Sequence, residues 1–169
     1  MLVRTATAAA LITALAAVLV SALPASGASF DVKHGHWSVM AITPITCMAL
    51  NRPAEEWNFS PFNMLALRQR RGSPLRLQVF AWPGVFKQGQ NVTITVTIDG
   101  GWTDLPAQTT DNLSAETSFL PPELLARLRT AGKAEFAISG MPSRLLFDVS
   151  AFDTVMKSLE DCVRQLPPG

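Results

Sequence analysis

The stretch Val92-Thr93-Ile94-Thr95-Val96-Thr97-Ile98-Asp99-Gly100-Gly101-Trp102 decides the fold class. Its first seven residues alternate a β-branched aliphatic side chain with threonine, so that the aliphatic groups all point to one side of an extended chain. This period of two predicts a half-buried β-strand with one solvated face. The Asp-Gly pair that follows favours a tight turn, which leads the chain into Trp102.

Further extended segments lie on both sides of this stretch. The predicted strands are residues 36–42, 46–50, 63–70, 75–82, 133–139 and 144–149. Pro44 separates the first two, because proline has no N–H to donate to a central ladder. The third and fourth are separated by Arg71-Gly72-Ser73-Pro74, which predicts a hairpin with Leu75, Leu77 and Val79 on one face.

Two segments instead have a period near 3.6. A short helix begins at Pro121-Pro122-Glu123 and ends at Gly132, with proline in the first turn, where its missing N–H does no harm. A second helix is expected at 151–165, with Ser150 as its N-cap and an apolar stripe that faces the sheet. The predicted fold is therefore mainly β (α+β), an antiparallel sheet or sandwich with one short internal helix and a C-terminal helix packed on it.

Residues 1–28 have the pattern of a secretory signal peptide. Arg4 precedes an apolar run, and Pro24 and a group of small residues ending at Ala28 follow it. We expect cleavage near Ala28, which leaves 29–169 as a single β-rich domain in the periplasm or outside the cell. An uncleaved anchor helix is the alternative, since the apolar run is almost long enough to span a bilayer. With cleavage, the membrane is contacted only transiently, through the signal peptide.

Composition excludes several classes of protein. Lys and Arg number 14 against 13 Asp and Glu, so the net charge of +1 gives no basic surface for nucleic acid. Hydrophobic residues make up 48% of the chain and charged residues 16%, which excludes a disordered chain and a coiled coil. A protein partner is therefore expected rather than a polyanion.

Export determines how the two cysteines are interpreted. In an oxidising compartment, Cys47 and Cys162 are expected to form the one intramolecular disulfide that two cysteines allow. Because they lie far apart in sequence, the chain-entropy treatment gives a stabilisation of about 4 to 5 kcal/mol. Two buried free thiols are the alternative, and neither cysteine lies in a redox motif.

The two ends of the mature chain carry a resemblance. Trp37-Ser38-Val39 is followed by Cys47, and Leu146-Phe147-Asp148-Val149-Ser150-Ala151-Phe152 leads into a helix that reaches Leu159-Glu160-Asp161-Cys162. In this layout the chain resembles the invasion-associated locus B family of small exported bacterial proteins, and related periplasmic families. The resemblance implies a β-rich envelope protein in which a disulfide ties the helix to the sheet. It brings no catalytic residues.

The sequence contains no evident catalytic, cofactor or metal site. His34-Gly35-His36 has too few ligands for a metal and is interpreted as a mobile polar segment leading into Trp37. The serines lack the motifs of acyl-transfer nucleophiles. Carboxylates that can pair for glycoside hydrolysis are Glu55, Glu56, Asp99, Asp104, Asp148 and Asp153, although their positions also suit turns and helix starts.

Two sets of residues are candidates for partner binding. Arg68, Arg70, Arg71 and Arg76 gather on the predicted hairpin, where they either grip a carboxylate or phosphate group or simply solvate the hairpin tip. Aromatic residues occur in the loops beside Pro61 and Pro83, where they either bind a partner or cap the core: Trp57, Phe59, Phe62, Trp82 and Phe86.

Three function classes remain open. The first is a non-enzymatic envelope protein that binds a protein partner. The second is a carboxylate-dependent hydrolase of the envelope. The third is a carrier of a small apolar ligand within a barrel-like cavity.

Overall fold

The computed structural model describes residues 30–52, 63–81, 86–142 and 144–167. The predicted signal peptide at 1–28 lies outside these residues. Within them, the strands are β1 Asp31–His34, β2 Trp37–Thr43, β3 Thr46–Asn51, β4 Met64–Arg70, β5 Arg76–Phe80, β6 Asn91–Ile98, β7 Gly101–Thr109, β8 Ser114–Thr117, β9 Lys133–Ile138 and β10 Arg144–Asp148. The helices are α1 Pro122–Thr130 and α2 Phe152–Gln165.

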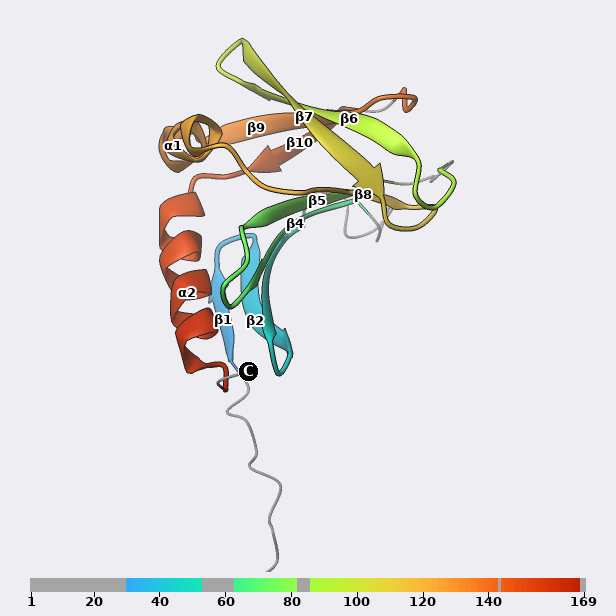
Figure 1. Cartoon of the computed structure of the whole chain (residues 1–169). Coiled ribbons are helices and arrows are strands. Elements are labelled where there is room, and N and C mark those ends of the chain that lie inside the picture. Colours follow the sequence, from blue (N-terminus) through green and yellow to red (C-terminus); the bar gives the residue numbers. More distant parts are fainter. Residues whose placement is uncertain (1–29, 53–62, 82–85, 143, 168–169) are drawn as a thin grey trace, which may run out of the picture.

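The ten strands of the described part of the chain form one antiparallel sheet, in the order β1-β2-β3-β4-β5-β8-β7-β6-β9-β10. Figure 1 shows that the sheet bends, so that β1 and β2 run across the direction of β9 and β10, with the curved β4 between them. The two halves thus face each other and enclose a core. The predicted fold class, a mainly β antiparallel sheet with a short internal helix and a C-terminal helix, is confirmed.

The β6–β7 hairpin follows the alternation of its sequence. The aliphatic residues of β6 are buried and its threonines are half-buried. Asp99 and Gly100 have φ values of 49° and 78°, as the central residues of a type I′ turn require. Glycine adopts this left-handed conformation without a steric penalty, so the turn closes tightly and all eight residues of β6 pair with β7.

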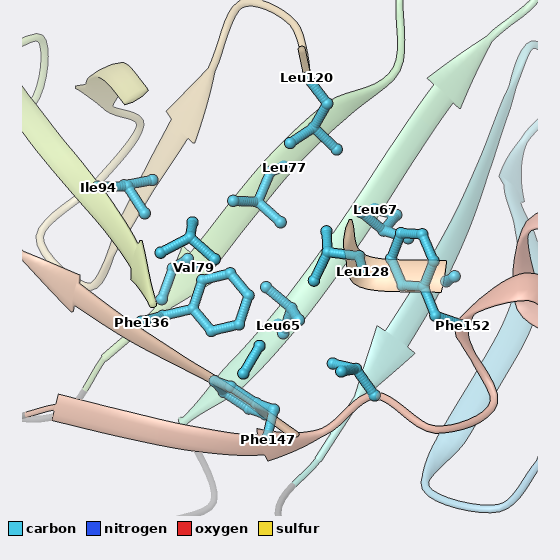
Figure 2. Close-up of a cluster of buried hydrophobic side chains, with 14 of the residues drawn as sticks. Leu65, Leu67, Leu77, Val79, Ile94, Leu120, Leu128, Phe136, Phe147 and Phe152 are labelled. Atoms are coloured by element: carbon cyan, nitrogen blue, oxygen red, sulfur yellow. The ribbon is translucent and has the colours of Figure 1, made fainter. Parts of the chain in front are cut away.

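The core lies between the two halves of the bent sheet. Figure 2 shows Phe136 and Phe147, from β9 and β10, directed toward Leu65 and Val79 of β4 and β5. The two phenylalanine rings meet edge to face with centroids 5.6 Å apart, an arrangement that the aromatic quadrupole favours. Residues from the middle of the strand order and from its β10 end therefore share one hydrophobic cluster.

Helix α2 packs on β1, β2 and β3, as its apolar stripe predicts. Phe152 in its first turn meets Trp37 of β2 edge to face, with ring centroids 6.0 Å apart. Cys162 in its last turns forms a disulfide with Cys47 of β3, across a Cα–Cα distance of 6.1 Å. Both cysteines are fully buried. The predicted disulfide is therefore confirmed, and it fits a location outside the reducing cytoplasm.

No helix among the described residues combines the length and the hydropathy that a membrane span requires.

Two local predictions are wrong. Ser150 does not cap α2, because Ala151 holds the N-cap position and Ser150 lies one residue before it. The N–H and the hydroxyl of Ser150 instead donate to Oδ1 of Asp148, at 2.9 and 2.6 Å. The helix begins after Ala151 without a side-chain cap. His34-Gly35-His36 is not a mobile segment, because His34 ends β1 and its register partner is Trp37 at the start of β2. Gly35, with φ of 58°, makes this turn.

Candidate functional site

The β4–β5 hairpin brings the predicted arginines onto one face of the sheet. Arg68 and Arg76 are direct register partners, and Arg70 lies two residues further along β4 on the same face. The opposite face of the hairpin carries the buried Leu77 and Val79. Two like charges in direct cross-strand contact repel each other unless a counter-charge is present.

Glu116 of β8 supplies that counter-charge. Its Oε1 lies 3.0 Å from Nη1 of Arg68, and its Oε2 lies 3.3 Å from Nη1 of Arg76. The Glu116 side chain is only 11% exposed, against 36% and 49% for the two arginines. One carboxylate therefore orients two guanidinium groups, each of which keeps further N–H donors for other acceptors.

The arginines border a small polar cavity of about 220 Å³. Its lining residues are Thr46, Arg68, Gln69, Arg70, Ser73, Pro74, Arg76 and Glu116. This volume suits a carboxylate or phosphate group better than a drug-sized ligand. Three guanidinium groups and one carboxylate give the cavity an excess of positive charge, and among the described residues Arg70 forms no ion pair. We call this cavity and its lining the basic pocket.

Arg71 has a different role from its neighbours. Its Nη2 donates to the backbone carbonyls of Val163 and Arg164, at 3.1 and 3.0 Å, and also to that of Leu166. These carbonyls end α2, where the helix lacks its own N–H donors and where the helix dipole favours a cation. Arg71 therefore ties the tip of the hairpin to the C-terminus of α2 and does not line the basic pocket.

The aromatic candidates are not brought into this site. Trp57, Phe59, Phe62 and Trp82 lie outside the described residues. Phe86 is 7% exposed and belongs to the core, as the capping interpretation predicts.

His34 and the described acidic candidates make contacts away from the basic pocket, and Glu55 and Glu56 lie outside the described residues. His34 Nε2 lies 2.7 Å from the hydroxyl of Ser158 on α2. Asp99 occupies the β6–β7 turn, and the hydroxyl of Thr95 donates to Asp104 Oδ1 at 2.6 Å. Asp153 pairs with Lys157 at 2.7 Å. No group of three or more metal-ligating side chains gathers among the residues that the structure describes.

Hydrogen bonds lower the pKa of two of these carboxyl groups. Asp148 accepts the side-chain and backbone bonds of Ser150, and these hold its pKa below the usual value. The pKa of Asp153 is lowered mainly by its hydrogen bond with Lys157. In both cases the lowered pKa reflects an ionised carboxylate that is stabilised by a contact within a local turn or a helix.

The residue that sequence reasoning missed is Glu116. It lies 40 residues from Arg76 along the chain, and β8 adjoins β5 although β6 and β7 lie between them in sequence. The predicted strands do not include β8. The Glu116-Thr117 pair in a short extended segment is too weak a signal to identify it.

Comparison with protein-family models, with curated proteins and with solved structures gave no significant match for this chain.

Proposed function

We propose that this protein is exported to the periplasm or the cell exterior and binds an acidic segment of a partner protein through the basic pocket. The observation that supports this most directly is the Arg68–Glu116–Arg76 cluster beside Arg70. In it, guanidinium groups are already oriented around a carboxylate, and they adjoin Arg70, which forms no ion pair with any residue that the structure describes. A carboxylate from a partner extends this arrangement by the same charge-assisted hydrogen bonds.

Export is supported by two independent features. The segment 1–28 has the charge and hydropathy order of a signal peptide. The Cys47–Cys162 disulfide is fully buried and joins the sheet to the last helix, as is common in proteins of oxidising compartments. The intact mass of the envelope form should show cleavage near Ala28, and a full-length mass would contradict it.

Binding to the basic pocket is testable with a fluorescein-labelled hexaglutamate peptide, with hexaglutamine as the uncharged control. We expect fluorescence anisotropy to show binding of hexaglutamate only, and this binding should weaken as salt rises, because exposed charges are screened. Arg70→Ala should weaken binding by about tenfold, since one charge-assisted hydrogen bond to a ligand contributes roughly 1.5 kcal/mol. The substitution is exposed and should leave folding nearly intact.

Arg144→Ala is the matched control. Arg144 is also an exposed strand arginine, paired with Glu135 at 2.7 Å, but it lies on β10, away from the basic pocket. We expect its affinity for hexaglutamate to equal that of the parent. The proposal is wrong if the parent does not bind hexaglutamate at low salt, or if Arg70→Ala and Arg144→Ala have the same affinity.

A further inference from the structure

A second exposed surface lies on the other half of the sheet, away from the basic pocket. It is formed by the solvated faces of β6, β7 and β9, where register pairs align Glu135, Thr97 and Trp102 in one row. The next row contains Thr95 and its partner Asp104. We call these five residues the Trp102 face. Trp102 is 72% exposed, the most exposed large hydrophobic side chain among the described residues.

The backbone beneath Trp102 is held rigidly. Arg127 of α1 donates from Nη2 to the carbonyls of Ile98 and Gly101, at 3.0 and 2.7 Å, and from Nη1 to the hydroxyl of Thr103 at 3.0 Å. These bonds span the turned end of the β6–β7 hairpin, which projects above α1 in Figure 1. The indole is thus displayed on an ordered platform, and a ligand that stacks on it meets little entropic cost from the backbone.

The neighbours of Trp102 are polar and nearly balanced in charge. Thr97 is its direct cross-strand partner. The hydroxyl of Thr95 binds Oδ1 of Asp104 at 2.6 Å, which leaves Oδ2 of this exposed carboxylate available as an acceptor. The charge of Glu135 is offset by Arg144, 2.7 Å away. Around the indole, the face therefore offers threonine hydroxyl groups and carboxylate oxygens as hydrogen-bond partners.

This chemistry selects among the ligands that stack on an exposed indole. Nucleic-acid bases stack well on tryptophan, but Asp104 leaves an exposed carboxylate on this face, which disfavours a phosphate backbone. An apolar protein surface finds little apolar area next to the indole, because the residues beside Trp102 are Thr97 and Asp104. The exposed Leu146 lies at the far end of the same row, beyond Glu135. A sugar ring with equatorial hydroxyls fits both the indole and its polar neighbours. The C–H groups of the sugar cover the indole, and its hydroxyls donate to the carboxylate oxygens and form hydrogen bonds with the threonine hydroxyls.

We propose that the Trp102 face binds a neutral saccharide of this kind, such as a glucose or N-acetylglucosamine polymer. This binding does not depend on the basic pocket, which is built from other strands. The two sites are therefore separable by substitution.

The test uses cellohexaose and chitohexaose as probes, titrated into the purified protein by isothermal titration calorimetry. We expect at least one of them to bind in the micromolar to millimolar range, with hexaglutamate having no effect on its affinity. Trp102→Ala should weaken binding at least tenfold, and Trp102→Phe should restore part of it, because a smaller ring still stacks. Asp104→Asn should weaken binding less, since an amide oxygen still accepts a hydrogen bond.

Phe119→Ala is the control, because Phe119 is 52% exposed but lies in the segment between β8 and α1. It should bind the probes as the parent does. Circular dichroism of each variant checks that the fold is retained. The proposal is overturned if neither oligosaccharide binds the parent at 10 mM, about the upper limit of a meaningful affinity. It is overturned equally if folded Trp102→Ala binds as tightly as the parent, or if an oligothymidylate displaces the saccharide.

Discussion

Removing the Cys47–Cys162 disulfide should strongly destabilise this protein. The crosslink closes a loop with a sequence separation of 115 residues. In the chain-entropy treatment, a loop of this length contributes about 4.8 kcal/mol at 25 °C. Residual structure in the denatured chain lowers this figure, so we expect Cys47→Ala/Cys162→Ala to lose about 3 to 4 kcal/mol. Alanine is the suitable replacement, because serine at these fully buried positions leaves a hydroxyl without a partner.

Urea denaturation followed by circular dichroism measures this loss. The midpoint should fall sharply, and the m-value should rise, because the uncrosslinked denatured chain exposes more surface. The two single variants are the controls. Each breaks the same covalent bond, so each should lose nearly as much as the double variant instead of half as much. A loss below about 1 kcal/mol, or single-variant losses that add up to that of the double variant, would refute the reasoning.

Three smaller effects follow from individual contacts. Arg71→Ala should lower the free energy of unfolding by about 1 kcal/mol, because three carbonyls at the end of α2 lose a shared donor; an unchanged urea midpoint would contradict this. Gly100→Ala should cost about 1 to 2 kcal/mol by thermal denaturation, since φ is 78° there, whereas Gly132→Ala, which meets open space, should be nearly neutral. The pKa of Asp148 is lowered in the folded state, so its contribution to stability is present above its usual pKa of 3.8 and is lost as pH falls through the folded pKa. Asp148→Asn should therefore flatten the acid limb of a stability-versus-pH curve below about pH 4, and an unchanged limb would show that this carboxyl is not responsible.

The local elements were predictable from sequence because their signals are local. The alternation in residues 92–98 indicates which side of the strand is buried. The Asp99-Gly100 pair indicates a tight turn with two positive φ angles, which few other residue pairs adopt. The apolar stripe of α2 likewise follows from spacings within one helix. The disulfide was predictable for a different reason, since two cysteines in an oxidising compartment permit one intramolecular pairing.

Short polar elements were predicted less well. β1 and β8 have four residues each, too few for a period of two to stand out. β1 is a strand because the longer β2 pairs with it. β8 is a strand because β5 and β7 pair with it on its two sides. Ser150 was predicted as a cap from its position before a helix, but α2 begins one residue later, with Ala151 at the N-cap position.

The sequence by itself determined the β-rich class, the C-terminal helix, the cysteine pair and the concentration of arginines on one hairpin. The tertiary structure alone decided what those arginines contact: Arg68 and Arg76 share Glu116 from β8, whereas Arg71 binds the end of α2. It also decided that Arg127 holds the hairpin that displays Trp102. The physical reason is range. Periodicity reflects the nearest few residues of an extended or helical chain, whereas the partner of a charged side chain depends on which distant strand or helix end the bent sheet brings beside it.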